Sequence, residues 1–133
     1  MPFQIKRVYD PAAPSDGIRV LVDRLWPRGL RKADRQWSIW MKDIAPSPDL
    51  RRWFNHQNDR FADFSARYRI ELRGSPALAE LRSLGAGKMV TLLYAAHDPH
   101  VNHAAVLLSV LRRSRPSASK AREFNIQRRP DPD

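Results

Sequence analysis

Short apolar stretches of the sequence follow the patterns of β-strands. Over residues 3–9, apolar side chains alternate with polar and basic ones, which is the two-residue period of a half-buried strand. The β-branched stretch 18–23 predicts a second strand, and the apolar stretch 89–94 predicts a third that is buried on both faces. Residues 35–41 fit either a short strand or a helical turn. Because strands buried on both faces are typical of parallel sheets, we expect a sheet that is at least partly parallel.

Four other segments have the period of amphipathic helices. Ser47-Pro48 and Ser75-Pro76 each combine a capping hydroxyl with a proline suited to the first helical position. The expected helices cover about residues 48–56, 59–73, 76–84 and 102–112. The order of strands and helices predicts a small, three-layer-like α/β domain, with a short sheet of three or four strands flanked by helices.

The composition changes near residue 113. Residues 114–133 are rich in proline, serine and arginine, and they contain only two large apolar side chains, Phe124 and Ile126. Such a segment buries too little surface to fold alone, so we expect it to be disordered. The sequence therefore predicts one domain over residues 1–113 and a basic tail over residues 114–133.

The overall composition restricts the classes of function. The chain has 24 Lys and Arg against 14 Asp and Glu, a net charge of +10, which favours nucleic acid, phosphorylated molecules or acidic surfaces as partners. Because the chain has no cysteine, disulfides, thiolate catalysis and thiolate metal sites are excluded. The N-terminus lacks a signal-peptide pattern, and the longest uncharged apolar run, 89–96, is too short to cross a membrane. We therefore expect a cytoplasmic protein that makes no membrane contact.

Polar residues directly follow two of the predicted strands. The loop after 18–23 carries Arg24, Trp26 and Arg28, and the loop after 89–94 leads to the start of the last helix. If the two strands are parallel neighbours, both loops open at the carboxyl edge of the sheet, where ligands of α/β proteins bind. Guanidinium groups of Arg24 and Arg28 suit a phosphate or carboxylate, and Trp26 suits stacking on a ring.

The candidate catalytic residues come from the same two loops. His103 and Asn102 start a helix, where free N–H groups favour an anion, and His103 suits the role of acid or base with Asp23 in support. The predicted ligand-binding residues are Arg24, Trp26, Arg28, Asn102, Tyr94 and His56. A purely structural alternative stays open, in which Asp23 pairs with Arg24, Trp26 is core and His103 caps its own helix.

Three histidines of the second loop have the spacing His-x-x-His-x-x-His. His97, His100 and His103, together with Asp98, resemble a ligand set for zinc or another divalent metal. Asp98-Pro99 also fits a simple turn. We predict no cofactor and no metal, and keep a divalent metal at these histidines as the weaker alternative.

The motifs in these loops resemble the YeaO-like family, known as domain of unknown function 488. The resemblance rests on Arg-Val-Leu-Val-Asp-Arg-Leu-Trp-Pro-Arg-Gly at 19–29, on Trp-Met-Lys-Asp-Ile-Ala-Pro-Ser at 40–47 and on Thr-Leu-Leu-Tyr-Ala-Ala at 91–96. It spans about residues 3–112 and implies a compact bacterial α/β domain of uncharacterised function. More distant relatives carry Cys-His-Arg where this chain has Asn102-His103-Ala104, which implies a shared site around His103 without thiol chemistry.

Two classes of function follow from these observations. The first is a small enzyme or ligand-binding protein for an anionic, phosphorylated or nucleotide-like molecule at the carboxyl ends of the strands. The alternative is a non-enzymatic protein that binds nucleic acid through its basic surface and tail. The sequence contains neither a P-loop nor a Gly-x-Gly-x-x-Gly motif, so no motif supports an ATPase or a Rossmann-type dinucleotide-binding protein. The patterns leave open whether the chain is an enzyme.

Overall fold

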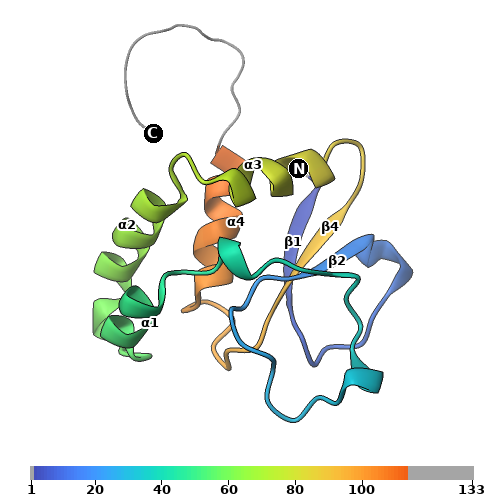
Figure 1. The fold of residues 1–133 in the computed structure, drawn as a ribbon, viewed down its shortest axis with the longest axis horizontal. Coiled ribbons are helices and arrows are strands. Elements are labelled where there is room, and N and C mark those ends of the chain that lie inside the picture. Colours follow the sequence, from blue (N-terminus) through green and yellow to red (C-terminus); the bar gives the residue numbers. More distant parts are fainter. Residues whose placement is uncertain (1, 114–133) are drawn as a thin grey trace, which may run out of the picture.

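A four-stranded sheet forms the centre of the protein in the computed structural model, which describes residues 2–113 (Figure 1). Its strands are β1 (Phe3–Arg7), β2 (Ile18–Leu21), β3 (Ile39–Trp40) and β4 (Val90–Tyr94). The strand order is β1-β4-β2-β3, and every neighbouring pair is parallel. The predicted α/β class and parallel sheet are therefore confirmed, and residues 35–41 contain a short strand. The prediction of a disordered tail concerns residues outside the described range.

The four predicted helices are present, with ends shifted by a few residues. They are α1 (Pro48–Phe54), α2 (Phe61–Leu72), α3 (Pro76–Leu84) and α4 (His103–Arg113). Ser47 Oγ accepts a hydrogen bond from Leu50 N at 3.2 Å, and Ser75 Oγ accepts one from Leu78 N at 3.3 Å. Both serines thus cap their helices as the sequence predicted. Within residues 2–113, no helix has the length and apolar composition needed to cross a bilayer.

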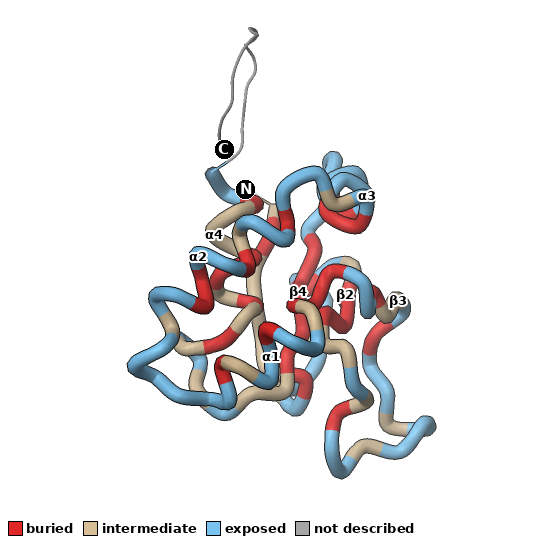
Figure 2. Tube along the Cα trace, turned by 60° about the vertical axis from the view of Figure 1, so that its left-hand side comes forward, coloured by how far each residue is buried: buried red, intermediate tan, exposed pale blue. Residues whose placement is uncertain are grey.

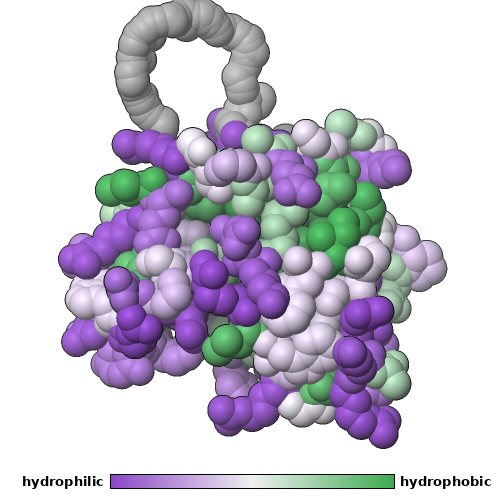
Figure 3. Space-filling view, viewed as in Figure 1, coloured by the Kyte–Doolittle hydropathy of each residue, from purple (hydrophilic) through white to green (hydrophobic). Residues whose placement is uncertain are grey.

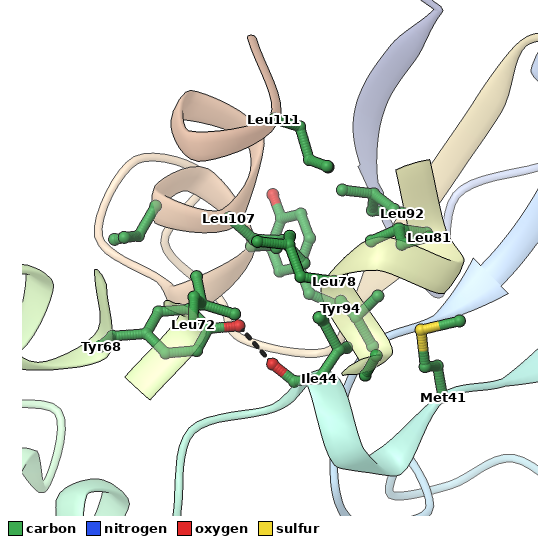
Figure 4. Close-up of a cluster of buried hydrophobic side chains, with 14 of the residues drawn as sticks. Met41, Ile44, Tyr68, Leu72, Leu78, Leu81, Leu92, Tyr94, Leu107 and Leu111 are labelled. Atoms are coloured by element: carbon green, nitrogen blue, oxygen red, sulfur yellow. Dashed lines mark hydrogen bonds between the residues drawn. The ribbon is translucent and has the colours of Figure 1, made fainter. Parts of the chain in front are cut away.

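All four α-helices contribute to the core on one face of the sheet, and α4 packs directly against β1 and β4. The main core joins side chains of these helices to Val20, Val90 and Leu92 of the two central strands, and buried residues gather along β2 and β4 (Figure 2). The Tyr68 hydroxyl of α2 donates a 2.6 Å hydrogen bond to the carbonyl of Ile44, which ties α2 to the chain that follows β3 (Figure 4). Such a covering layer is typical of parallel sheets, whose faces are usually shielded from solvent.

Irregular segments cover the opposite face of the sheet, where the sequence analysis expected flanking helices. Leu21 and Leu93 project from the central strands into a second, smaller core that also contains Trp37. Trp26 packs edge-on against Trp37 and Trp40, with ring centroids 5.1 and 5.7 Å apart. Three tryptophans from loop and edge strand thus replace a helix as the third layer of the domain.

A buried ionic cluster anchors the loop between β1 and β2. The carboxylate of Asp16 pairs with Lys6 at 3.1 Å and, in a shorter contact, with Arg19. The hydroxyl of Thr91 on β4 donates to the Asp16 carbonyl at 2.7 Å, so the cluster links β1, β2 and β4. Burial alone would raise the pKa of Asp16, but the hydrogen bond from Ala13 N and the two cations outweigh it and hold the pKa below 3.8.

Candidate functional site

The candidate site lies where β2 and β4 end side by side. The two strands pair in parallel from Ile18 with Val90 to Leu21 with Leu93, and Val22 N continues the ladder to Leu93 O at 3.1 Å. The two strands are thus parallel neighbours, and the loops after both of them open at one edge of the sheet. One step further, Ala95 N donates to Asp23 Oδ2 at 3.1 Å, which fixes the carboxylate between the two loops.

His103 and Asp23 form a close pair at this edge. The Nε2 atom of His103 lies 3.0 Å from the carbonyl oxygen of Val22 and 3.3 Å from Asp23 Oδ1. Because both neighbours are acceptors, we assign the hydrogen of the ring to Nε2. No described residue contacts the other ring nitrogen, Nδ1, through a hydrogen bond. His103 is also the first residue of α4, so the ring stands at the positive end of that helix.

Asp23 is held in an environment that disfavours its charge. Its Oδ1 atom is covered from solvent and has no full hydrogen bond of its own within residues 2–113, since the ring of His103 is shared with Val22 O. Burial raises the pKa of Asp23 above 3.8, while the positive charge of a protonated His103 and the N–H of Ala95 act in the opposite direction. Burial and the neighbouring charges therefore act in opposite directions on this carboxyl group.

Replacing His103 with alanine is expected to raise the pKa of Asp23 further. The substitution removes the cation that partly offsets the burial of the carboxyl group. Carboxyl ¹³C chemical shifts followed through a pH titration measure this change directly. The matched reference is Asp34, whose pKa lies below 3.8 because Arg31 donates to it. An unchanged Asp23 titration in a folded variant would contradict the coupling.

Tyr68 and Arg24 complete the surroundings of the pair. The ring of Tyr68 stands edge-on to His103 with centroids 6.1 Å apart, and burial raises the pKa of its hydroxyl well above 10.0, so it stays a phenol. The guanidinium of Arg24 donates to the carbonyls of Ala45 and Pro46 at 3.3 Å and does not pair with Asp23. The salt bridge suggested as a structural alternative is therefore not formed.

The helices add charges that the sequence analysis did not assign to this site. The positive charge of Arg51, an exposed residue of α1, acts on the Asp23 carboxyl group. Glu71 of α2 accepts hydrogen bonds from Ser47 N at 2.9 Å and from Ser47 Oγ at 2.6 Å, so it holds the start of α1. Arg67 of α2 stacks over the ring of Trp53, with the guanidinium carbon 4.3 Å from the ring centroid.

Trp26 and Arg28 do not join this pair. The indole of Trp26 belongs to the core on the opposite face of the sheet, and its Nε1 donates to Leu30 O at 2.6 Å. The side chain of Arg28 is exposed, and its backbone carbonyl accepts a hydrogen bond from the Tyr9 hydroxyl at 2.7 Å. The structure therefore shows no contact of Trp26 or Arg28 with His103, and the indole of Trp26 belongs to the cover of the other sheet face.

The remaining predicted residues have structural positions. Asn102 caps α4, because its Oδ1 accepts a hydrogen bond from Ala105 N at 2.8 Å. Its Nδ2 donates to Asp98 O at 2.7 Å, so both polar atoms of this buried side chain have partners within the protein. Tyr94 is buried in the main core. His56 is exposed, adopts a left-handed backbone with φ of 55°, and lies next to Phe54. None of these three side chains is hydrogen-bonded to the ring of His103 within residues 2–113, so His103 and Asp23 remain as the core of the site.

The three histidines of the second loop do not converge. His97 and His100 are exposed, and Asp98 Oδ1 accepts hydrogen bonds from His100 N at 2.8 Å and Val101 N at 3.1 Å, as a turn does. Residues 2–113 contain no group of three histidine or acidic side chains placed to hold a metal ion. The structure therefore does not support a metal site at these histidines.

The fold and the site define a small α/β domain with a His–Asp pair at the carboxyl edge of a parallel sheet. The family described as "Inactive DUF488-N3 subclade" matches residues 2–126. An uncharacterised protein of Mycobacterium tuberculosis is 50% identical over 108 residues, which cover 81% of this chain and 92% of the relative. The uncharacterised protein YeaO of Escherichia coli is 44% identical over 113 residues, which cover 84% and 98%. The chain therefore belongs to the YeaO-like DUF488 family. No solved structure matches it.

Proposed function

We propose that the protein binds a small anionic molecule, phosphorylated or nucleotide-like, at the carboxyl ends of β2 and β4. The orientation of His103 carries this proposal. Its Nε2 faces Val22 O and Asp23 Oδ1, while Nδ1 has no partner among residues 2–113. In the protonated ring, Nδ1–H donates to an anionic oxygen, and the positive end of α4 favours the same charge.

The cations around the pair support an anionic ligand. Arg24 is fixed beside the site by two backbone carbonyls, and Arg51 contributes a positive charge that acts on Asp23. Arg51 is exposed, so it is accessible to a ligand in solution. Hydrophilic patches alternate with apolar ones on the face of the molecule shown in Figure 3, and the whole chain carries a net charge of +10. A ligand with a phosphate or carboxylate would gain from all of these charges.

Binding without turnover fits the site better than catalysis. The matched family is described as inactive. The chain has no cysteine, and in the described part of the chain His103 Nε2 contacts only a backbone carbonyl and Asp23. A histidine that activates a nucleophile needs a hydroxyl or thiol within hydrogen-bond reach. Asp23 and His103 then serve as positioning and ligand-binding groups, while a catalytic role for them requires a nucleophile supplied by the ligand or water.

The full-length protein is expected to bind AMP or ribose 5-phosphate in isothermal titration calorimetry, and the His103→Ala variant should bind at least about tenfold more weakly, the loss expected for one charge-assisted hydrogen bond. Arg51→Ala should also weaken binding, because it removes a nearby cation. Arg35→Ala is the matched control, since Arg35 is exposed and lies in the loop on the other face of the sheet. A folded His103→Ala variant that binds as well as the parent would refute the proposed site.

Nucleic-acid binding stays the alternative function, on the basis of the net charge and the basic tail over residues 114–133. It predicts that deleting the tail weakens binding of a short oligonucleotide and that binding falls steeply with salt. The same deletion should leave AMP binding at the strand edge unchanged. The two functions are therefore separable with one truncated variant and two ligands.

A further inference from the structure

A second concave surface lies between α2, α3 and α4, away from the strand edge. This groove has a volume of about 480 Å³ and contains four arginines in its walls, Arg69, Arg73, Arg82 and Arg113. Among residues 2–113, none of the side chains that line it is acidic. We call it the arginine groove. Like charges gathered in one concavity repel each other, so an anion inside it would be strongly attracted.

Two of these arginines have guanidinium donors that are open to a ligand as far as residues 2–113 are concerned. Arg69 is partly buried, and its Nε atom is covered from solvent without a hydrogen-bond partner within residues 2–113. The guanidinium of Arg113 is exposed, and no carboxylate or carbonyl of the described residues pairs with it. Each guanidinium can present a fork of donors to phosphate oxygens. The groove therefore offers more donors than the protein itself uses.

The floor of the arginine groove is apolar. Leu72, Leu78 and Val110 line it beside the arginines, together with Gly74, which adds no side chain. A volume of this size is in the range of cofactor and small-molecule sites. An apolar surface rimmed by cations suits a molecule that joins several phosphates to a ring. Inorganic anions alone would use the rim and leave the floor uncovered.

We propose that the arginine groove binds a polyphosphate attached to a small apolar ring, the chemistry of a nucleoside triphosphate. This site is distinct from the strand edge, because His103 and Arg113 stand at opposite ends of α4. An eleven-residue helix is roughly 16 Å long. The groove does not depend on the ligand proposed for His103, and either site can exist without the other.

The arginines also have a simpler structural role that the test must separate from binding. Arg69 and Arg113 lie in the last turns of α2 and α4, where cations stabilise the helix dipole. That role predicts a change in melting temperature without ligand after substitution. It predicts no difference in ligand affinity between folded variants.

The experiment measures binding of ATP, inorganic triphosphate and adenosine to the full-length protein by isothermal titration calorimetry. Arg113→Glu is compared with Arg35→Glu, an equal change of net charge at an exposed position of the loop on the other face of the sheet. Arg69→Gln provides a second variant inside the groove, and His103→Ala reports on the strand edge. Thermal unfolding of each variant without ligand establishes that it is folded.

The proposal predicts that ATP binds more tightly than triphosphate and that adenosine binds weakest. Arg113→Glu or Arg69→Gln should weaken ATP binding at least about tenfold, the loss of one charge-assisted hydrogen bond, while Arg35→Glu leaves it within about twofold. Equal weakening by Arg113→Glu and Arg35→Glu would overturn the proposal in favour of unspecific attraction. Loss of ATP binding only in His103→Ala would assign the ligand to the strand edge instead. Binding of oligonucleotides but not ATP would also overturn it.

Discussion

Replacing Asp16 with alanine is expected to lower the free energy of unfolding by about 3–5 kcal/mol, as for a broken buried ion pair. The substitution removes the carboxylate but leaves Arg19, which is only 7% exposed, without its anion. Lys6 and the N–H of Ala13 lose the same partner. Since small proteins are stable by only about 5–15 kcal/mol, the variant should melt at a much lower temperature.

The matched control for this variant is Asp49→Ala. Asp49 pairs with Arg52 on the surface of α1, and its side chain is 91% exposed. Such surface pairs contribute less than about 1 kcal/mol, so urea unfolding should separate the two alanine variants clearly. Similar midpoints for both would contradict the importance of the buried cluster.

The stabilising effect of Asp16 should also depend on pH. Its pKa in the folded protein lies below 3.8, so its contribution to stability is present above about pH 4 and is lost as the pH falls through the folded pKa. The parent should therefore lose its stability advantage over Asp16→Asn in acid, below about pH 4. A constant difference in unfolding free energy from pH 7 to pH 2 would contradict the low pKa of Asp16.

Leu92→Ala is expected to destabilise the protein by about 2–5 kcal/mol, the usual cost of emptying a fully buried leucine site. Leu92 lies on the central strand β4, is completely buried, and packs within the core shared with Leu81 and Leu107 (Figure 4). Strands on both sides of β4 hold its backbone in place, so the surrounding residues have little freedom to collapse into the cavity.

Leu25→Ala is the matched control, because it makes the same leucine-to-alanine change at an exposed position. Leu25 follows β2 and is 58% exposed, so Leu25→Ala should change the unfolding free energy by about 0.5 kcal/mol or less. Chemical unfolding of both variants at 25 °C measures the difference. A Leu92→Ala variant as stable as Leu25→Ala would mean that β4 is not the centre of the core.

The regular elements could be predicted because their signals are local. The apolar run at 89–94 has too few polar positions for an exposed strand, and it became β4 with neighbours on both sides. The Ser-Pro pairs at 47–48 and 75–76 mark helix starts through one hydroxyl and one fixed backbone angle. Each of these signals depends on only a few consecutive residues.

The loop that covers the second face of the sheet could not be predicted from such local signals. An apolar side chain such as Leu21 or Leu93 requires a cover, but it does not distinguish a helix from a loop. The loop after β2 folds back and places Trp26 between Trp37 and Trp40. This packing depends on contacts between segments far apart in sequence, so Trp26 was placed at the site although it belongs to the core.

The candidate site was only partly accessible from the sequence. Asp23 and His103 could be paired because both follow strands whose parallel pairing was a reasonable expectation. Tyr68 has the helical spacing of an ordinary core residue, and nothing local indicates that its ring meets His103. The influence of Arg51 on Asp23 depends on how α1 docks against the sheet edge, which no periodicity describes.

NMR titration of the ¹⁵N,¹³C-labelled protein with AMP, in parallel with the Arg113→Glu variant, tests most directly the proposal that the His103–Asp23 pair binds an anionic ligand. Saturable shifts are expected that are largest at the ring of His103 and the amide of Ala95, and that are the same in the variant. Shifts confined to other residues, or no shift of the His103 ring at millimolar AMP, would contradict it.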